Sequence, residues 1–513
     1  MNFECAFAAY SLTISEVLMK RFFALLMCLV TVLALFSCKK SEDDTPTDPT
    51  EESNNYGYSF PQNIPDEDYG GKSFRILEWG DTGGSHWSAF EFIYNESLEG
   101  DVVNDAVRER DRIFEEKYNV SIEYIVKNKG DLTSFASQCI DAGSDDFDVF
   151  FPTLSSIGSL AISGRLYDLN EFSDIFNFDE SWWDTAACKQ LSIGGHLFFT
   201  TSDLTLVDKN STWAIFFTKE LLDKYPDLLD GYDSIQDMVK KGDWTIEKMY
   251  EMCSAVQHDD GDGEWTENDT YGRYGEGFDA GALMVGCGSV ITEKNSEDIP
   301  QYVWSSHADE YVTSFEYVNK IMSTDCSMTN NALKGYDDIW VDGVGGMMEK
   351  GQLLFNCTGM NRCRLYRGLD IEFGIIPMPK ANSEQESYHS FMSMGQGNCV
   401  AIPISCSDPE ATAKLLEAYT CLASQTTYTA YVDKALQYKY LPYDENSKDM
   451  LEIIFNNRLF DPVDVYGWGS GNGSIYQGKA SGLVSRVKTF EKVTTKMMNS
   501  RINQMFEALA NQG

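Results

Sequence analysis

The sequence is poor in basic residues. Lys and Arg together number 40 against 80 Asp and Glu, so the formal net charge is −40. Nucleic acids and the anionic headgroups of membranes should be repelled by a chain of this charge. A neutral ligand or a cation suits this electrostatic field better than a phosphate compound does. We therefore expect no nucleic-acid partner.

Histidine and the common catalytic motifs are also scarce. The chain has five histidines and neither an HExxH nor a GxSxG pattern, so zinc-protease and serine-hydrolase signatures are absent. With 80 acidic residues no glycosidase-like carboxylate pair stands out, although such a pair is not excluded. We expect the protein not to be an enzyme and to require no cofactor.

Cysteine is present without any CxxC pair. Several cysteines lie inside apolar stretches, where Cys packs as a small hydrophobe, so buried free thiols are expected for most of them. An extracytoplasmic location would permit disulfides, and Cys357 with Cys363, or Cys399 with Cys406, are the nearest pairs in sequence.

Long hydrophobic runs are missing except near the N-terminus. The basic pair Lys20–Arg21 precedes an apolar run from Phe22 to Phe36, about 15 residues, which is below the roughly 20 residues that span a bilayer. The following Leu35–Cys38 resembles a bacterial lipobox, although Phe36 is bulkier than usual at its position. Residues 19–37 are predicted to be a lipoprotein signal peptide, with Met19 as the start. An ordinary signal peptide and an N-terminal anchor helix are the alternatives.

The lipobox interpretation predicts that Cys38 is lipidated and anchors the chain to the outer side of the cell membrane. Residues 38–65 then form an acidic linker rich in Ser, Thr and Pro with almost no aliphatic residues, as in a solvated tether. The rest of the 513-residue chain is too long for one core, so at least two domains are expected.

The body begins with alternating strands and helices. Strands are predicted at 74–79, 120–126 and 147–151, and amphipathic helices at 101–118 and 132–142. A further helix is predicted at 484–510. Strands that alternate with helices are typical of an α/β fold with a parallel or mixed sheet.

Seven short segments recur in a characteristic order along nearly the whole body. They are Asn104–Val107 with Arg110, Phe114–Val120, Phe147–Val149, Gly164–Leu169, Ala214–Leu222, Gly242–Thr245 and Phe373–Lys380. Each segment is weak alone, but the ordered set resembles extracellular solute-binding proteins of the maltose-binding type (family 1), the substrate-binding lipoproteins of ABC importers. Thr218–Lys219 stands where the family commonly has Asn-Lys.

This resemblance implies an α/β, two-lobed periplasmic-binding-protein-like fold of type II, with discontinuous lobes joined by a hinge. Lobe one would be 66–205 plus 372–425, and lobe two 206–371 plus 426–513. It also implies a monomer that captures a ligand in the cleft between the lobes and delivers it to an ABC permease.

Aromatic and polar residues on loops point to a sugar ligand. Sugar rings stack their C–H faces on aromatic rings, and their hydroxyls bond to carboxylates, amides and guanidinium groups. Glycines beside Trp79 and Trp468 favour exposure of these two, and Trp468→Ala is expected to weaken sugar binding with little loss of stability. The candidate ligand-binding residues are Trp79, Asp81, Trp87, Trp182, Asp203, Arg362, Tyr466 and Trp468.

The loop His258–Asp269 has the spacing of an EF-hand calcium loop. Asp260, Asp262, Glu264 and Asp269 would bind a structural calcium ion, but His258 replaces the usual Asp at the first position. An acidic surface turn explains the loop equally well.

The function predicted from these features is that of a membrane-tethered substrate-binding component of an ABC transporter, with a neutral oligosaccharide as ligand. A surface lipoprotein glycan hydrolase and a glycan-binding protein without a transporter are the alternatives, because they would use the same aromatic and acidic residues.

Overall fold

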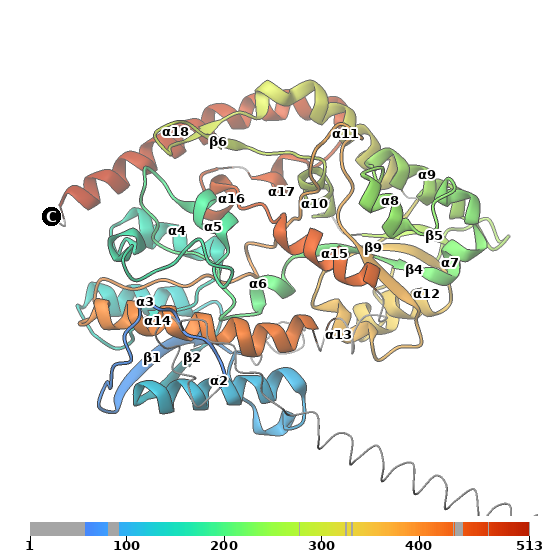
Figure 1. Ribbon diagram of the computed structural model, residues 1–513. Helices are drawn as coiled ribbons and strands as arrows, with labels where there is room; N and C mark the ends of the chain where they lie inside the picture. Colours follow the sequence, from blue (N-terminus) through green and yellow to red (C-terminus); the bar gives the residue numbers. More distant parts are fainter. Residues whose placement is uncertain are drawn as a thin grey trace, which may run out of the picture. The chain divides into compact units, whose positions relative to one another are not determined.

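The structure is a computed structural model that describes residues 57–80, 92–275, 278–323, 326–329, 332–433, 436, 445–469 and 471–511 (Figure 1). The predicted signal peptide, Cys38 and residues 38–56 of the linker lie outside the described residues, as do Asp81 and Trp87. No helix among the described residues is both long enough and apolar enough to cross a membrane.

Strands in the described residues form two main sheets. The first has the order β2-β1-β3 and is parallel, and the second has the order β10-β4-β9-β5-β8 and is mixed. A separate hairpin joins β6 and β7. The strands are β1 (Lys72–Trp79), β2 (Val120–Lys127), β3 (Val149–Phe150), β4 (Trp213–Thr218), β5 (Tyr271–Tyr274), β6 (Thr292–Lys294), β7 (Pro300–Tyr302), β8 (Ser327–Met328), β9 (Leu353–Gly359) and β10 (Phe373–Ile376).

Helices cover these sheets. In the first half of the chain they are η1 (Glu96–Leu98), α2 (Val102–Tyr118), α3 (Leu132–Asp141), α4 (Leu154–Ile162), η2 (Leu169–Phe172), α5 (Thr185–Leu191), α6 (Val207–Asn210), α7 (Lys219–Lys224), η3 (Pro226–Leu229), α8 (Ile235–Lys241) and α9 (Ile246–Val256). In the second half they are α10 (Asp279–Gly286), η4 (Trp304–His307), α11 (Ala308–Ile321), η5 (Ile339–Gly345), α12 (Gly346–Glu349), α13 (Arg362–Tyr366), α14 (Pro409–Ala423), η6 (Ser424–Tyr428), α15 (Glu445–Asn456), α16 (Pro462–Tyr466), α17 (Asn472–Ile475), η8 (Ala480–Gly482) and α18 (Leu483–Ala510).

The opening βαβ unit follows from local sequence signals. The Asp101 side chain accepts hydrogen bonds from the backbone N–H groups of Val103 and Asn104 and so caps the start of α2. Asn119 ends α2 in the left-handed conformation, with φ of 48°, and β2 begins at the next residue. The predicted strands and helices from 74 to 151 are confirmed within a few residues, as is the C-terminal helix.

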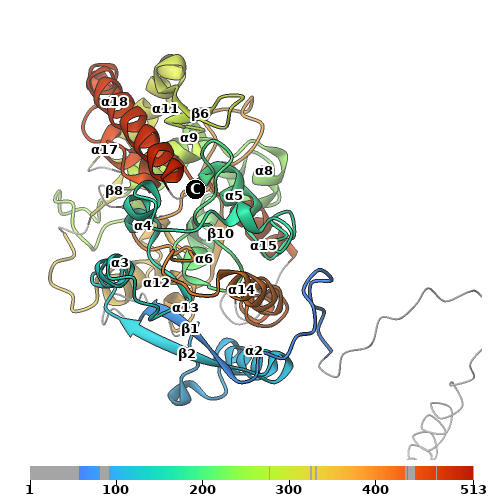
Figure 2. The same cartoon turned by 90° about the vertical axis from the view of Figure 1, so that its left-hand side faces the viewer.

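Helices α2 and α14 pack side by side at the first sheet in both views (Figures 1 and 2). Helix α14 then runs directly into the π-helix η6. Further on, α15 packs on β10 and α8 at the second sheet. The chain from α14 to α15 therefore connects the two sheets.

Two other connections run next to each other. Thr200 pairs with Val400 in an isolated β-bridge near the first sheet, and Thr212 pairs with Met392 near the second. The N–H of Trp213 donates to the carbonyl of Phe391 at 2.8 Å. Residues 200–213 and 391–400 thus cross between the sheets as antiparallel neighbours. We call these two segments, with η6, the crossing segments.

The predicted lobe boundary at residue 372 needs a correction. Strand β10 pairs antiparallel with β4, so residues 373–376 belong to the second sheet and not to lobe one. The chain reaches the first sheet only later, where Ala401 pairs with Phe150. Helix α18 contacts α4 and also α11 and β7, so it packs against elements from both sides.

All ten cysteines beyond Cys38 are free and buried, as expected for most of them. Neither Cys357 with Cys363 nor Cys399 with Cys406 forms a disulfide.

Candidate functional site

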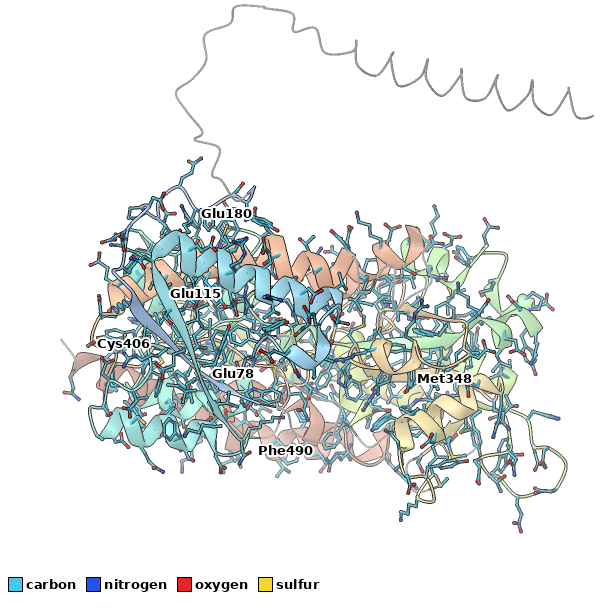
Figure 3. The ribbon with its side chains drawn as sticks, turned by 90° about the horizontal axis from the view of Figure 1, so that it is seen from below. Glu78, Glu115, Glu180, Met348, Cys406 and Phe490 are labelled. Carbon is cyan, nitrogen blue, oxygen red and sulfur yellow. The ribbon has the colours of Figure 1, made fainter. Side chains whose placement is uncertain are left out.

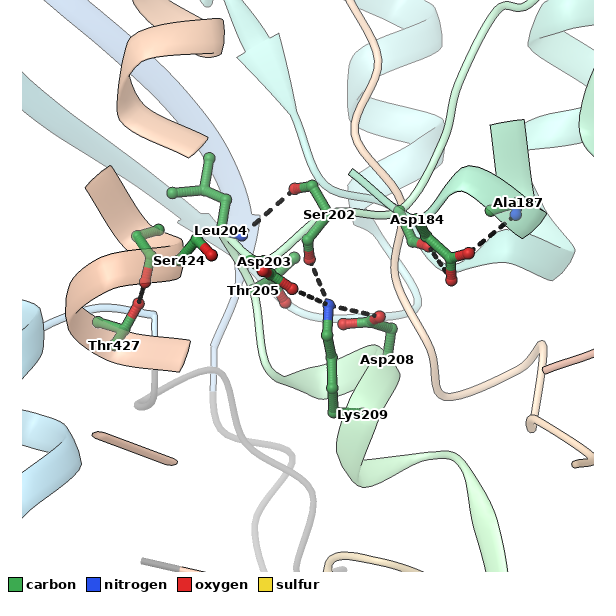
Figure 4. A network of polar contacts seen from close by, with 12 residues as sticks. Asp184, Ala187, Ser202, Asp203, Leu204, Thr205, Asp208, Lys209, Ser424 and Thr427 are labelled. Atoms are coloured by element: carbon green, nitrogen blue, oxygen red, sulfur yellow. Dashed lines mark hydrogen bonds and ion pairs between the residues drawn. The ribbon is translucent and has the colours of Figure 1, made fainter. Parts of the chain in front are cut away.

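A buried polar network lies where the crossing segments meet (Figure 4). Lys209, on the single turn α6, is at its centre. Its Nζ donates to the Ser202 carbonyl at 2.6 Å and lies 3.0 Å from Oδ2 of Asp208 and 3.3 Å from Oδ1 of Asp203. The same Nζ lies 5.6 Å from the ring centroid of Tyr428 in η6. Two of the crossing segments, residues 200–213 and η6, therefore contribute to this network or contact it.

Arg458 closes the network from the C-terminal part of the chain. Its Nη1 lies 2.8 Å from Oδ2 of Asp208, and its Nη2 lies 2.7 Å from Oδ2 of Asp184. Arg458 pairs through its backbone with Ser390, which precedes a crossing segment. The guanidinium thus joins two carboxylates that are far apart in sequence.

Local structure fixes the carboxylates. Asp184 caps α5, because its Oδ1 accepts from the N–H of Ala187 at 3.0 Å. Asp208 lies in the short turn α6, so its side chain and that of Lys209 leave adjacent positions of one turn. Thr205 donates to Oδ1 of Asn398 at 2.8 Å, which holds the two antiparallel crossing segments together.

The network holds three carboxylates and two cations. Burial raises the pKa of Asp203 to about 6, although Lys209 opposes this shift. Burial lowers the pKa of Arg458, but Asp184 and Asp208 outweigh that effect, and its pKa lies above the ordinary value. Among the described residues, Oδ1 of Asp208 and Nε of Arg458 have no hydrogen-bond partner. Both atoms are buried, so the network keeps one spare acceptor and one spare donor inside the protein.

Sequence reasoning identified only Asp203 of this network as a candidate. Asp184 stands beside a tryptophan pair, and Asp208, Lys209 and Arg458 lie in no recognisable motif. The signal that was available is the charged pair Asp208–Lys209 inside an otherwise uncharged stretch from Leu204 to Phe217. Nothing local distinguishes Arg458.

The other predicted residues do not gather at the network. Trp79 and Trp468 are 0% and 1% exposed, so the exposure expected from their glycine neighbours is wrong. Gly80 is required because a Cβ there would lie 2.9 Å from Cγ1 of Val126, and Gly469 because a Cβ would meet Thr494 on α18. These glycines permit close packing of the chain and do not expose the tryptophans.

Tyr466 is also buried. Its ring stacks on that of Trp468 with centroids 4.7 Å apart, and its hydroxyl donates to the Leu191 carbonyl at 3.0 Å. Arg362 is buried with its guanidinium 3.8 Å from the ring centroid of Trp340. Trp182 is half-buried and lines a separate cavity. Whether these residues contact a ligand stays a prediction.

The predicted calcium loop is mostly exposed. Carboxylate oxygens of Asp259, Asp260 and Asp262 lie within 4.8 Å of one another. The two oxygens of Asp269 instead accept from the N–H groups of Asp260 and Thr266, at 2.7 and 2.6 Å. Asp259 therefore takes part in the cluster in place of Glu264 and Asp269, and calcium binding stays a prediction.

No family model and no curated protein sequence matches this chain. Solved structures do match it. The sugar-binding protein MalE from the phytopathogen Xanthomonas citri is 11% identical, with 85% of this chain and 99% of that chain covered and a TM-score of 0.54. A sugar transporter from Rhizobium etli in an open conformation is 13% identical, with 83% and 99% covered and a TM-score of 0.52. A Listeria monocytogenes ABC substrate-binding protein in complex with cycloalternan is 14% identical, with 86% and 99% covered and a TM-score of 0.49.

The similarities to the Xanthomonas citri and Rhizobium etli proteins establish the fold. The chain has the two-lobed α/β fold of periplasmic-binding proteins of the maltose-binding type, and the predicted fold class is confirmed. In this fold the first sheet belongs to one lobe and the second sheet to the other. The crossing segments are then the connections between the lobes.

Proposed function

We propose that this protein is the substrate-binding component of an ABC importer and captures a neutral oligosaccharide between its two lobes. The observation that carries the proposal is the buried network of Asp203, Asp208, Lys209 and Arg458 on and beside the segments that join the lobes. The structural neighbours in Xanthomonas citri and Rhizobium etli are named as a sugar-binding protein and a sugar transporter, which supports a sugar as ligand.

The chemistry of the network suits a neutral ligand. The carboxylates supply the acceptors that sugar hydroxyls require, whereas the three N–H groups of Lys209 already point to Ser202, Asp203 and Asp208. The carboxylates outnumber the cations three to two, and the whole chain carries a net charge of −40, so an anionic sugar would be repelled. The side chain of Asp203 has the largest exposed fraction in the network, 10%, and we assign it the direct contact with the ligand. Arg458 acts as a positioning residue.

Capture by closure of the lobes requires no covalent chemistry. A ligand that bonds to both lobes stabilises the closed arrangement relative to the open one and so shifts the population toward it. Because the crossing segments connect the two lobes, they must change conformation when the lobes close. The polar network on them would link occupancy of the cleft to the hinge.

The test is a binding measurement by isothermal titration calorimetry with neutral tetrasaccharides of glucose, xylose and mannose. We expect saturable binding of one ligand per chain in the cleft, with no turnover of the sugar. Lys209→Met should weaken it at least about tenfold, equivalent to about 1.4 kcal/mol. The matched control is Lys488→Met, on α18, which should bind as the unaltered protein does. Hydrolysis of the tetrasaccharides, or unchanged affinity in Lys209→Met, contradicts the proposal.

We also propose that Cys38 is lipidated and that the acidic linker holds the lobes within reach of a membrane permease. The lipobox-like Leu35–Cys38 and the polar composition after it support this. Mass spectrometry of the mature N-terminus should show an acylated Cys38. If Cys38→Ser leaves the mature protein bound to the membrane, the anchor is the apolar helix and not a lipid.

A further inference from the structure

A cavity lies beside the start of the described chain and is lined by none of the charged residues of the polar network. Its volume is about 540 Å³, within the range of small-molecule sites. Two segments form it, residues 60–63 and the loop from Asn177 to Trp182. The lining residues are Phe60, Pro61, Gln62, Asn63, Asn177, Glu180 and Trp182.

A buried carboxylate holds one wall of this cavity in place. Glu417, on α14, is fully buried, and burial raises its pKa. Its Oε1 accepts from Nε1 of Trp182 at 3.0 Å and from Nδ2 of Asn177 at 2.7 Å. Its Oε2 accepts from Nε1 of Trp183 at 2.7 Å. Because three donors converge on one carboxylate, the Trp182 indole and the Asn177 amide have fixed positions.

The opposite wall is tied to the first by amide hydrogen bonds. Nδ2 of Asn63 donates to the carbonyls of Asp174 and Ile175 at 3.0 and 2.8 Å, and its Oδ1 accepts from Asn177 at 2.9 Å. Phe60 packs edge-on against Tyr118 with centroids 6.0 Å apart. The cavity therefore has an aromatic ring on each of its two segments.

The lining chemistry selects a class of ligand. Two aromatic rings offer stacking surfaces, and Gln62 and Glu180 are exposed polar side chains beside them (Figure 3 labels Glu180 at the periphery). Among the described residues that line the cavity, Glu180 alone is charged, so an anionic ligand would find no cation among them. Apolar faces together with amide and carboxylate groups match a neutral saccharide.

We propose that this cavity is a second, independent binding site for a neutral saccharide, with the sugar ring stacked on Trp182. Its hydroxyls bond to Gln62, to Glu180 and to Oδ1 of Asn63, whose two N–H groups already donate to backbone carbonyls. The site holds sugar on the outside of one lobe and does not depend on lobe closure. This inference goes beyond the proposed function and does not rest on it.

The test is ¹⁹F NMR of the full-length protein labelled with 5-fluorotryptophan, with the Trp182 resonance assigned from its loss in Trp182→Phe. Maltotetraose, cellotetraose, xylotetraose and mannotetraose are each added to about 20 mM, which detects millimolar dissociation constants. We expect at least one of them to shift the Trp182 resonance saturably. If none does so, the proposal is overturned, and the cavity serves only to pack the N-terminal segment.

Two variants separate this site from the cleft. In Lys209→Met the Trp182 response should persist with its original dissociation constant, even where cleft binding is lost. Loss of the Trp182 response in Lys209→Met would overturn the proposal, because one site would then explain both signals. Glu180→Gln should raise the dissociation constant of the Trp182 response at least about threefold. The control Glu316→Gln, at an exposed position on α11, should leave it unchanged. A response unchanged in Glu180→Gln contradicts the assigned hydroxyl contact.

Discussion

Arg458 and Asp184 form an ion pair with 2.7 Å between Nη2 and Oδ2, and both side chains are at least nine-tenths buried. Asp184 begins helix α5, whereas Arg458 follows α15, more than 270 residues later in the chain. The same guanidinium bonds Asp208 at 2.8 Å. One cation therefore compensates two buried carboxylates that come from different segments of the chain.

Arg458→Met should destabilise the protein strongly. Removal of one partner of a buried ion pair leaves an uncompensated charge, which typically costs about 3–5 kcal/mol. Here Asp184 and Asp208 both lose their guanidinium partner. Urea unfolding should show this loss in the free energy of unfolding. The matched control is Arg108→Met, whose exposed pair with Glu99 at 3.7 Å should contribute less than about 1 kcal/mol. Equal losses in the two variants would show that the network has no structural role.

Ionisation of Asp203 should make stability depend on pH. Burial raises its pKa from the ordinary value of 3.8 to about 6. Between these two values the folded chain retains a proton on Asp203 that the unfolded chain has released, so the free energy of unfolding falls as the pH rises. A shift of this size corresponds to roughly 2–3 kcal/mol over the window.

The measurement compares the unaltered protein with Asp203→Asn, since other buried acids titrate as well. The difference in free energy of unfolding between the two should decrease by roughly 2–3 kcal/mol from about pH 4 to about pH 7. Below the ordinary pKa, where Asp203 is neutral in both states, this difference should be constant. A difference that stays constant across the whole window would mean that Asp203 is ionised with an ordinary pKa.

Sequence patterns were sufficient for the opening elements and the last helix but not for the network. Helix α2 could be predicted because both of its ends are local, the Asp101 cap and the left-handed Asn119. The position of Arg458 depends on pairing with Ser390 and on two carboxylates from distant segments, and none of these leaves a periodic pattern. Residues that meet through tertiary contacts of this kind can be identified only from the folded structure.

Trp468→Ala should cost stability, contrary to the expectation from its glycine neighbours. The indole is buried and stacks on Tyr466, and removal of a buried tryptophan side chain typically costs about 3–5 kcal/mol. Trp468→Phe should lose less free energy of unfolding than Trp468→Ala, because it keeps an aromatic ring against Tyr466. The control is Trp265→Ala, at a position that is 38% exposed. Thermal or urea unfolding measures the loss in free energy of unfolding for each variant. A loss below about 1 kcal/mol for Trp468→Ala would again favour Trp468 as an exposed ligand contact.

Calcium should stabilise the protein through the loop that follows α9. Carboxylate oxygens of Asp259, Asp260 and Asp262 are close enough to share one ion, and Asp269 holds the loop closed through two backbone N–H groups. A site with a dissociation constant of about 0.1 mM, typical of extracellular modules, would add about 1.4 kcal/mol at about 1 mM calcium. The melting temperature in calcium should therefore exceed that in EDTA by roughly 1–3 °C. Asp262→Asn should abolish the difference and Glu316→Gln should preserve it. Equal melting temperatures in calcium and EDTA would identify the loop as an acidic surface turn.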